Sequence, residues 1–173
     1  HDLETALGAL DAEFTPNDRF FVRSHFGPAV LDERSYRLEI GGLVDKPISL
    51  GLRELRKLPK VTLPAVLQCS GNGRGFYRPR VPGAQWERGA VGQAAWTGVR
   101  LGDLLRRVGV KPEGKFVRLL GGERPPMPTT PQFARSLPID KALHPATLLA
   151  YEMNGALLPL LHGAPLRAVV PGW

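Results

Sequence analysis

The sequence contains a single cysteine, no long apolar run, no repeat and no low-complexity tract. One cysteine cannot form an internal disulfide, so cysteine usage leaves the redox compartment open. A helix that crosses a bilayer needs about 20 predominantly apolar residues, and no run in the chain approaches that length. The sequence therefore predicts neither a disulfide-stapled scaffold nor a membrane span.

Acidic residues are the scarcer charged class, with 16 Asp and Glu against 23 Lys and Arg. The resulting net charge of +7 suits an anionic ligand or a nucleic acid. The aromatic residues are not interleaved with Lys and Arg, and no zinc or helix-turn-helix signature occurs, so nucleic-acid binding is not favoured. With 173 residues, 43% of them hydrophobic, the chain can bury one sizeable core.

Hydrophobic periodicity changes repeatedly along the chain. Residues 35–43 alternate apolar and polar side chains, which predicts a strand, and residues 60–69 read as a buried strand that Pro64 breaks. Helical spacing of leucines predicts helices within 49–59 and 99–109, the second ending at Gly109. Two further strands are expected in 115–122 and 166–172. The mixture without regular βα alternation predicts an α+β domain with an irregular mixed sheet.

The cysteine lies in the stretch LQCSGNGRG, residues 67–75. The spacing of its glycines does not match the dinucleotide fingerprint, and no Gly-Lys-Ser/Thr follows as in a phosphate-binding P-loop. What remains is a glycine-rich run of backbone amides with Arg74 beside the Cys69 thiol. A thiolate is a soft metal ligand, but one protein thiolate could hold a metal only if a cofactor supplied the other ligands.

Four blocks of sequence resemble the sulfite oxidase family of molybdenum enzymes, and they occur in the family's order. LQCSGNGR resembles that family's cysteine loop, and FFVRSH at 20–25 resembles a segment near its start. The stretch 82–105 resembles the family's segment with two tryptophans, and LLAYEMNGALLPLLHGAPLRAVVPG at 148–172 resembles its C-terminal block. The resemblance implies the family's irregular molybdopterin-binding fold for residues 1–173.

The resemblance also implies a molybdenum-molybdopterin cofactor and oxygen-atom transfer, with oxidation of sulfite to sulfate as the expected reaction. Cys69 would be the metal ligand, and Arg23 and Trp86 would line the pocket for the anionic substrate. The pterin and its phosphate would be held by His25, Ser70, Arg74, His162 and Arg167. Electrons would leave to a separate cytochrome c-type partner, because the chain has no Cys-x-x-Cys-His haem motif and no haem is expected in it.

The sequence departs from the family pattern at two places, and each departure leads to a further prediction. Phe133 stands where the sulfite-oxidising members have a tyrosine, so a reductase or a sulfane dehydrogenase acting on another substrate is the alternative. The chain stops at VVPGW, where family members continue. We therefore expect a domain that is incomplete at its C-terminal end and lacks the family's immunoglobulin-like dimerisation domain, with a homodimer in the full-length protein. Exported relatives imply a periplasmic location.

The residues by themselves leave other interpretations open. Cys69 could be the nucleophile of a hydrolase with His25 or His162 as base and Asn72 as the orienting group. A tryptophan is normally buried for packing, so we expect Trp96 in the core, and Trp86 in the pocket only because its flanks match the family.

Overall fold

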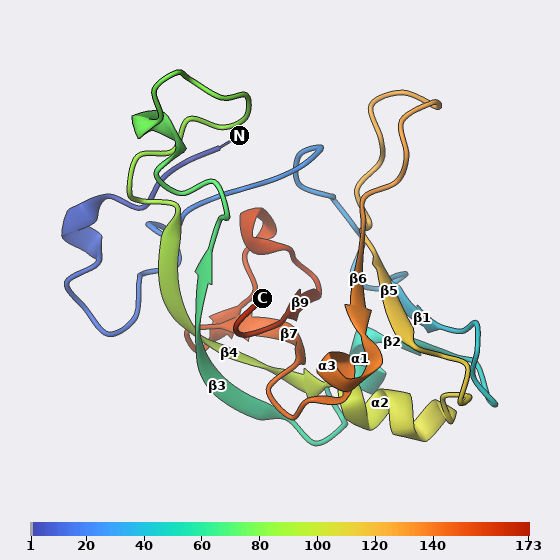
Figure 1. Cartoon of the computed structure of the whole chain (residues 1–173). Helices are drawn as coiled ribbons and strands as arrows, with labels where there is room; N and C mark the ends of the chain where they lie inside the picture. Colours follow the sequence, from blue (N-terminus) through green and yellow to red (C-terminus); the bar gives the residue numbers. More distant parts are fainter. Residues whose placement is uncertain (1) are drawn as a thin grey trace.

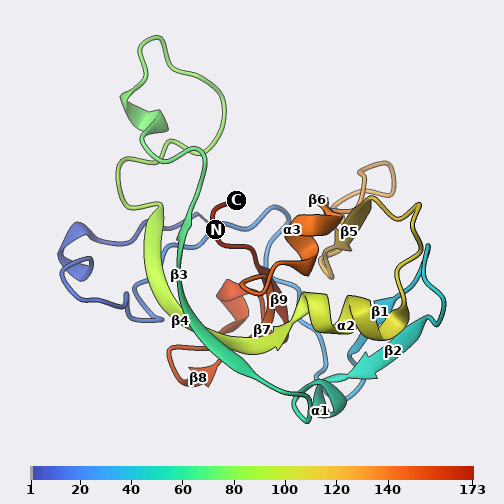
Figure 2. The same ribbon diagram turned by 60° about the horizontal axis from the view of Figure 1, so that its bottom comes forward.

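The computed structural model describes residues 2–173 and contains three antiparallel β-sheets with short helices around them (Figures 1 and 2). The central five-stranded sheet has the order β3-β4-β7-β8, with β9 paired to β7, and consists of β3 (Val61–Gln68), β4 (Val91–Arg100), β7 (Leu148–Met153), β8 (Ala156–Leu157) and β9 (Arg167–Val169). The two hairpins are β1 (Arg37–Ile40) with β2 (Ile48–Gly51), and β5 (Phe116–Leu120) with β6 (Ala134–Pro138). The helices are α1 (Leu52–Leu55), α2 (Leu101–Val108), α3 (Ile139–Leu143) and the 3₁₀ turns η1 (Leu7–Ala9), η2 (Arg74–Phe76) and η3 (Leu160–His162). The expected α+β class is confirmed.

The strand β3 differs from its prediction in two ways. It runs unbroken through Pro64, which lies opposite Ala95 of β4, and it alternates between exposed residues and residues that are partly or fully buried instead of being buried throughout. Both differences follow from its position, because β3 is at the edge of the central sheet. Proline, which has no N–H to donate, is tolerated at such an edge.

The helix α2 agrees with the leucine periodicity. Leu101, Leu104 and Leu105 are buried, and Gly109 ends the helix in the left-handed conformation with φ 67°. The helix predicted within 49–59 is only the four residues of α1. Its N-terminal part is instead strand β2, which the 3.6-residue spacing of leucines did not reveal.

Two hydrophobic clusters lie on opposite sides of the central strands. The site cluster includes Phe20, Trp86 and Trp96, and the helix cluster includes the buried leucines of α1 and α2. Strand β7 contributes to both through alternate residues, because Leu148 and Ala150 belong to the site cluster and Leu149 and Tyr151 to the helix cluster. Trp96 is fully buried, as expected.

Candidate functional site

Cys69 follows β3 directly and begins the glycine-rich loop. Its side chain is partly buried and packs against the site cluster, while its N–H donates to the Ala90 carbonyl at 2.9 Å. The Asn72 side chain holds the loop to the start of β4, since its Oδ1 accepts the Ala90 N–H at 3.1 Å. These bonds fix the thiol at the C-terminal end of an ordered strand. Ser70, the next residue, is exposed.

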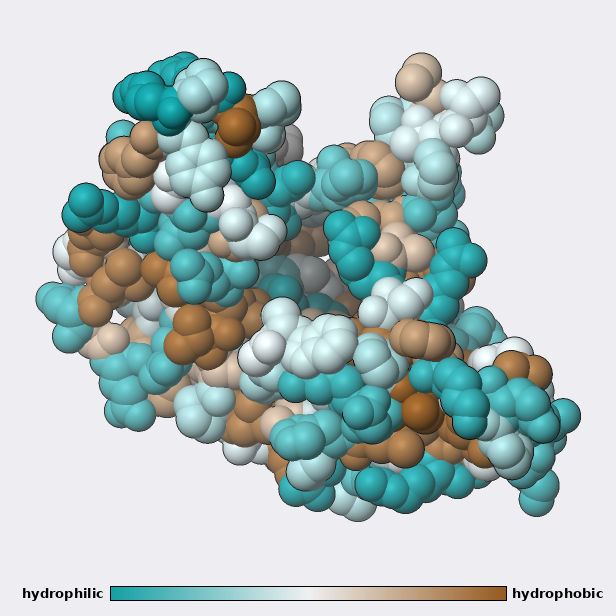
Figure 3. Space-filling view, in the orientation of Figure 1, coloured by the Kyte–Doolittle hydropathy of each residue, from teal (hydrophilic) through white to brown (hydrophobic). Residues whose placement is uncertain are grey.

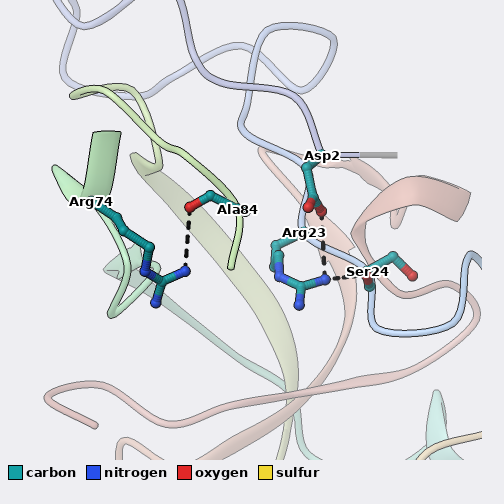
Figure 4. Close-up of polar contacts among 5 residues, drawn as sticks. All are labelled: Asp2, Arg23, Ser24, Arg74 and Ala84. Carbon is teal, nitrogen blue, oxygen red and sulfur yellow. Dashed lines mark hydrogen bonds and ion pairs between the residues drawn. The ribbon is translucent and has the colours of Figure 1, made fainter. Parts of the chain in front are cut away.

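The Arg74 guanidinium is held between two glycines. A Cβ built on Gly71 would lie 2.7 Å from its Cζ, and one built on Gly83 would lie 2.3 Å from a guanidinium nitrogen. The group donates one hydrogen bond across the site, to the Ala84 carbonyl at 3.2 Å (Figure 4). Because a guanidinium carries five N–H donors, Arg74 can hold an anion as well as this carbonyl.

Three buried side-chain polar atoms in the described chain have no hydrogen-bond partner. Two of them belong to predicted site residues, namely the indole Nε1 of Trp86 and the Nε of Arg167. Among residues 2–173 the third unpartnered buried atom is the Tyr151 hydroxyl, which belongs to the helix cluster. A buried donor without an acceptor costs about 1–3 kcal/mol. An oxygen-rich ligand such as a pterin phosphate or a metal oxo group would satisfy such donors, so these residues fit the implied cofactor.

His162 and Arg167 form a second group of predicted residues, close to each other at η3 and β9. His162 is buried on η3, with its Nε2 2.8 Å from the Asn17 carbonyl and its ring edge-on to Phe20. Arg167 donates to the His162 carbonyl at 2.9 Å and lies over the Trp96 ring, 4.9 Å from its centroid. Both side chains therefore rest on the site cluster that also contains Trp86.

Burial changes the acid-base behaviour of this pair. Desolvation lowers the pKa of His162, the Asn17 carbonyl opposes that effect, and the positive charge of Arg167 adds to it. Desolvation lowers the pKa of Arg167 to about 10, so the guanidinium stays charged at neutral pH. The site thus combines a neutral imidazole with a fixed cation. Because a carbonyl only accepts, His162 carries its proton on Nε2 and leaves Nδ1 as an acceptor.

His25 lies on the irregular segment between the bridge at Val22 and strand β1. Its exposed ring contacts two aromatic rings, with centroids 4.4 Å away at Phe26 and 5.1 Å away at Phe133. The Arg135 guanidinium covers the Phe133 ring at 4.4 Å. The position where sulfite-oxidising members have tyrosine is therefore in contact with a predicted cofactor residue.

The Arg23 side chain is exposed, and its guanidinium forms an ion pair with the N-terminal segment. One guanidinium nitrogen lies 3.5 Å from an Asp2 carboxylate oxygen and also donates to the Ser24 carbonyl (Figure 4). An exposed pair of this kind contributes about 0.2–1 kcal/mol. An anionic substrate could therefore displace Asp2 from Arg23 at small cost.

The predicted residues come from three parts of the chain. The loop and the residues up to β4 supply Cys69, Ser70, Arg74 and Trp86. The η3–β9 segment supplies His162 and Arg167, and the segment that follows Phe21 supplies Arg23 and His25. The surface is hollowed between the loop of residues 70–88 and the β5–β6 hairpin, and η3 lies between these two regions (Figures 1 and 3). The roles assigned to these residues stay predictions.

The hydrolase interpretation finds no support in this geometry. Within residues 2–173 the Cys69 thiol makes no hydrogen bond to an imidazole, and the Asn72 side chain is bonded to Ala90.

The described chain also holds no group of three or more His, Cys, Asp or Glu side chains able to bind a metal ion. No helix formed by residues 2–173 is sufficiently long and apolar to span a bilayer.

Sequence reasoning missed the residues that hold the site from behind. Asn154, in the left-handed conformation with φ 53°, bonds through its side-chain amide to Ala95, Thr15 and Asn17. The carbonyl of Asn17 in turn positions His162. The only local signal was the Asn-Gly pair at 154–155, which is typical of a tight turn. Nothing in the sequence indicated its link to residue 17.

Sequence comparison places the chain among molybdopterin proteins. The family described as oxidoreductase molybdopterin binding domain matches residues 25–173. The chain is 42% identical to the mitochondrial sulfite oxidase of Drosophila melanogaster, over 98% of this chain and 30% of that protein. It is 38% identical to the NADH nitrate reductase of Ulva prolifera, over 92% of this chain and 19% of that protein. The chain therefore spans about a third or less of these relatives.

The fold agrees with a solved structure. The sulfane dehydrogenase SoxCD of Paracoccus pantotrophus superposes with a TM-score of 0.82 at 36% identity, and the match covers 95% of this chain and 41% of that one. Proteins named for three different substrates thus share one scaffold with this chain.

Proposed function

This chain belongs to the oxidoreductase molybdopterin-binding family, and on that basis we propose that it binds a molybdenum-molybdopterin cofactor and oxidises sulfite to sulfate. The observation that carries the proposal is the pair of buried, unpartnered donors on Trp86 and Arg167. Both belong to the set of residues that the family pattern assigns to the cofactor site and substrate pocket. When bound, the cofactor supplies oxygen-atom transfer with two-electron storage.

The charge and position of each residue suggest which part of the cofactor or substrate it would bind. Cys69, fixed at the end of β3, would provide the thiolate ligand to the metal. Arg74 and Arg167 carry positive charge in partly buried positions, which suits the phosphate of the pterin. His162 would accept a hydrogen bond through Nδ1, while Ser70 and His25 lie at the exposed rim. Arg23 and Trp86 would bind the substrate anion.

A second substrate has one observation in its favour. Phe133 contacts His25 but offers no hydroxyl at the position where sulfite-oxidising members have tyrosine. A site that hydrogen-bonds its substrate discriminates through such groups. Oxidation of a sulfane sulfur or reduction of another small oxo substrate is therefore the alternative. Electron transfer to a separate cytochrome c-type protein, dimerisation and a periplasmic location also stay proposals.

The decisive experiment measures molybdenum per chain by elemental mass spectrometry on protein from a host that makes molybdopterin. The wild type and the control Gln68→Ser, a neighbouring exposed residue on β3, should bind close to one molybdenum per chain. Cys69→Ser should lower sulfite-dependent reduction of cytochrome c by more than about 100-fold, because even residues outside the first coordination shell cost 10–100-fold when changed. It should leave the circular dichroism spectrum unchanged.

Three outcomes would count against the proposal. Full activity in Cys69→Ser would remove the ligand assignment. Molybdenum in the wild type without sulfite oxidation would favour the alternative substrate. A complete absence of molybdenum and pterin from the wild type would count against cofactor binding by these 173 residues.

A further inference from the structure

Residues 2–5 join the two segments that carry the residues predicted to bind substrate, and we call them the N-terminal link. Leu3 forms an antiparallel bridge with Val22, with main-chain hydrogen bonds of 3.1 and 2.8 Å. The Thr5 N–H donates to the Gly89 carbonyl at 2.9 Å. The first contact adjoins the arginine predicted to bind substrate, and the second lies shortly after the predicted tryptophan. The link therefore holds the two segments at fixed positions relative to each other.

The Glu4 side chain lies between these two anchors, and both of its carboxylate oxygens accept main-chain hydrogen bonds. Oε1 accepts the Glu87 N–H, and Oε2 accepts the Gly89 N–H at 2.9 Å. A carboxylate can accept both bonds because each oxygen is an acceptor, whereas a carboxamide offers one acceptor and one donor group. The geometry at this position therefore requires a carboxylate.

The close approach of the link requires glycine at position 89. A Cβ built on Gly89 would lie 2.2 Å from the Thr5 carbonyl oxygen and 2.9 Å from the Glu4 Cβ. Both distances are shorter than van der Waals contact allows, so any side chain would push the link away. Glu4 and Gly89 thus form one contact, although they are 85 positions apart in the sequence.

The bond from Glu87 to Glu4 acts directly on the peptide group that follows Trp86. The carbonyl of this peptide group accepts the Gly75 N–H at 2.8 Å, and its N–H is the one that donates to Glu4. The peptide is therefore held by the glycine-rich loop on one side and by the N-terminal link on the other. Trp86 is 3% exposed within the site cluster, and its indole Nε1 has no acceptor within residues 2–173.

We propose that Glu4 is a positioning residue for the substrate pocket. By holding the peptide between Trp86 and Glu87, its carboxylate sets the direction in which the indole N–H of Trp86 points. Because the indole makes no hydrogen bond of its own within the described chain, packing and this held peptide alone determine its orientation. The identification of the indole's acceptor as a substrate oxyanion rests on the proposed function, whereas the positioning itself does not.

Nuclear magnetic resonance of the ¹⁵N-labelled 173-residue chain tests the positioning without cofactor or turnover. The chain has three tryptophans, so three indole N–H signals are expected, and single Trp→Phe variants assign them. Glu4→Gln keeps the shape of the side chain and removes one acceptor, so it should shift the Trp86 signal and leave the Trp96 signal in place. The control Glu13→Gln, at an exposed residue of the same region, should shift neither.

Sulfate affinity, measured by isothermal titration calorimetry, tests the consequence for the pocket. Trp86→Phe removes the indole donor and should weaken sulfate binding at least about 10-fold, because a hydrogen bond to a charged group is lost. Glu4→Gln should weaken it about 5-fold, since the donor is retained but less well directed. The double variant should bind sulfate no more weakly than Trp86→Phe, because the effects of residues that act through one group are not additive.

The two measurements separate this proposal from the proposed function. An unmoved Trp86 signal in Glu4→Gln would overturn the proposal, and so would equal movement of the Trp86 and Trp96 signals, which would indicate a general loss of packing. A loss of sulfate affinity in Glu4→Gln that adds in full to that of Trp86→Phe would also overturn it. A shifted Trp86 signal in a chain that binds no sulfate would support the positioning and contradict the anion pocket of the proposed function.

Discussion

At the residue scale, several side chains of the candidate site make contacts that the local sequence around them does not indicate. Cys69 and Arg74 lie in one loop, yet Arg74 reaches across to Ala84, and its guanidinium occupies space that side chains at Gly71 and Gly83 would fill. Arg167 is charged, yet it rests on the Trp96 ring with its Nε unpartnered. These residues hold fixed positive charge and free donors, which is the chemistry that an anionic cofactor needs.

Phe133 provides a test of substrate at this scale. Phe133→Tyr adds a hydroxyl without changing the ring, and if sulfite is the substrate its kcat/KM should rise about 10-fold, because a hydrogen bond to a charged group contributes about 1.5–3 kcal/mol. The control is Phe26→Tyr, on the other ring that contacts His25. Steady-state kinetics with sulfite measures both. An unchanged or lower value for Phe133→Tyr would favour the alternative substrate.

His162 makes stability depend on pH in a predictable direction. Its pKa is lowered in the folded state, chiefly by burial, from an ordinary value of 6.5. Below about pH 6.5 the unfolded chain takes up a proton that the folded chain resists, so the free energy of unfolding should fall as the pH drops. Above that pH this residue contributes no slope.

Urea unfolding at about pH 7.5 and pH 5.5 measures this effect. The loss of stability between the two pH values should be smaller in His162→Gln than in the wild type, and unchanged in the control His144→Gln, because His144 is exposed. An equal loss in the wild type and His162→Gln would show that the imidazole is not the group responsible.

At the scale of elements, the turn between β7 and β8 connects the central sheet to the site. Asn154 bonds to the β4 backbone at Ala95 and to Asn17, whose carbonyl holds His162. Asn154 therefore supports His162 through Asn17, although its side chain makes no hydrogen bond to a predicted cofactor residue within residues 2–173. The turn uses the left-handed conformation of Asn154, which asparagine tolerates better than most residues.

Two substitutions separate the contributions of Asn154. Asn154→Gly keeps the backbone conformation and loses the side-chain bonds, so it should lower the free energy of unfolding by about 2 kcal/mol. Asn154→Ala adds a left-handed penalty of roughly 1 kcal/mol. Urea denaturation of both variants measures the difference, and equal stabilities would contradict the strain argument.

The sequence allowed some elements to be predicted and concealed others for physical reasons. Leucine spacing and Gly109 predicted α2 because both signals are local. Pro64 was misleading because edge position depends on distant pairing. The long strand β4 was not predicted, since glycines interrupt it. One of them, Gly98, is required by tertiary packing, as an added Cβ would lie 2.0 Å from the Leu149 carbonyl oxygen.

The candidate site, like the fold, could be predicted only in part from the sequence. The loop from Cys69 to Arg74 is contiguous and matched a family pattern. The bond between Asn17 and His162 joins residues 145 positions apart, and the contact of His25 with Phe133 joins a residue of one block to a residue outside all four. No local pattern contains such pairs.

At the scale of the whole molecule, the excess of basic residues acts on any anionic substrate before it reaches the site. A net charge of +7 raises the local concentration of anions, and salt screens this attraction over about 10 Å at 0.1 M ionic strength. The effect is one of association rate and is separate from contacts made by Arg23.

If the proposed sulfite oxidation holds, we therefore expect kcat/KM for sulfite to fall several-fold between about 20 mM and 500 mM NaCl. The double variant Lys57→Glu/Lys60→Glu changes two exposed residues outside the predicted site, so it should reduce the slope without altering kcat. A slope that is the same in the variant would locate the salt effect at the site itself.

The two clusters share strand β7 as a common wall, with Leu148 and Ala150 on one side and Leu149 and Tyr151 on the other. Neither cluster can assemble until that strand is in place, and a shift of the strand that improves packing on one side disturbs the other. The site cluster and the helix cluster therefore belong to one cooperative folding unit. In evolution, a substitution on one side of β7 is therefore constrained by side chains on the other side, although the two groups of side chains are not in contact.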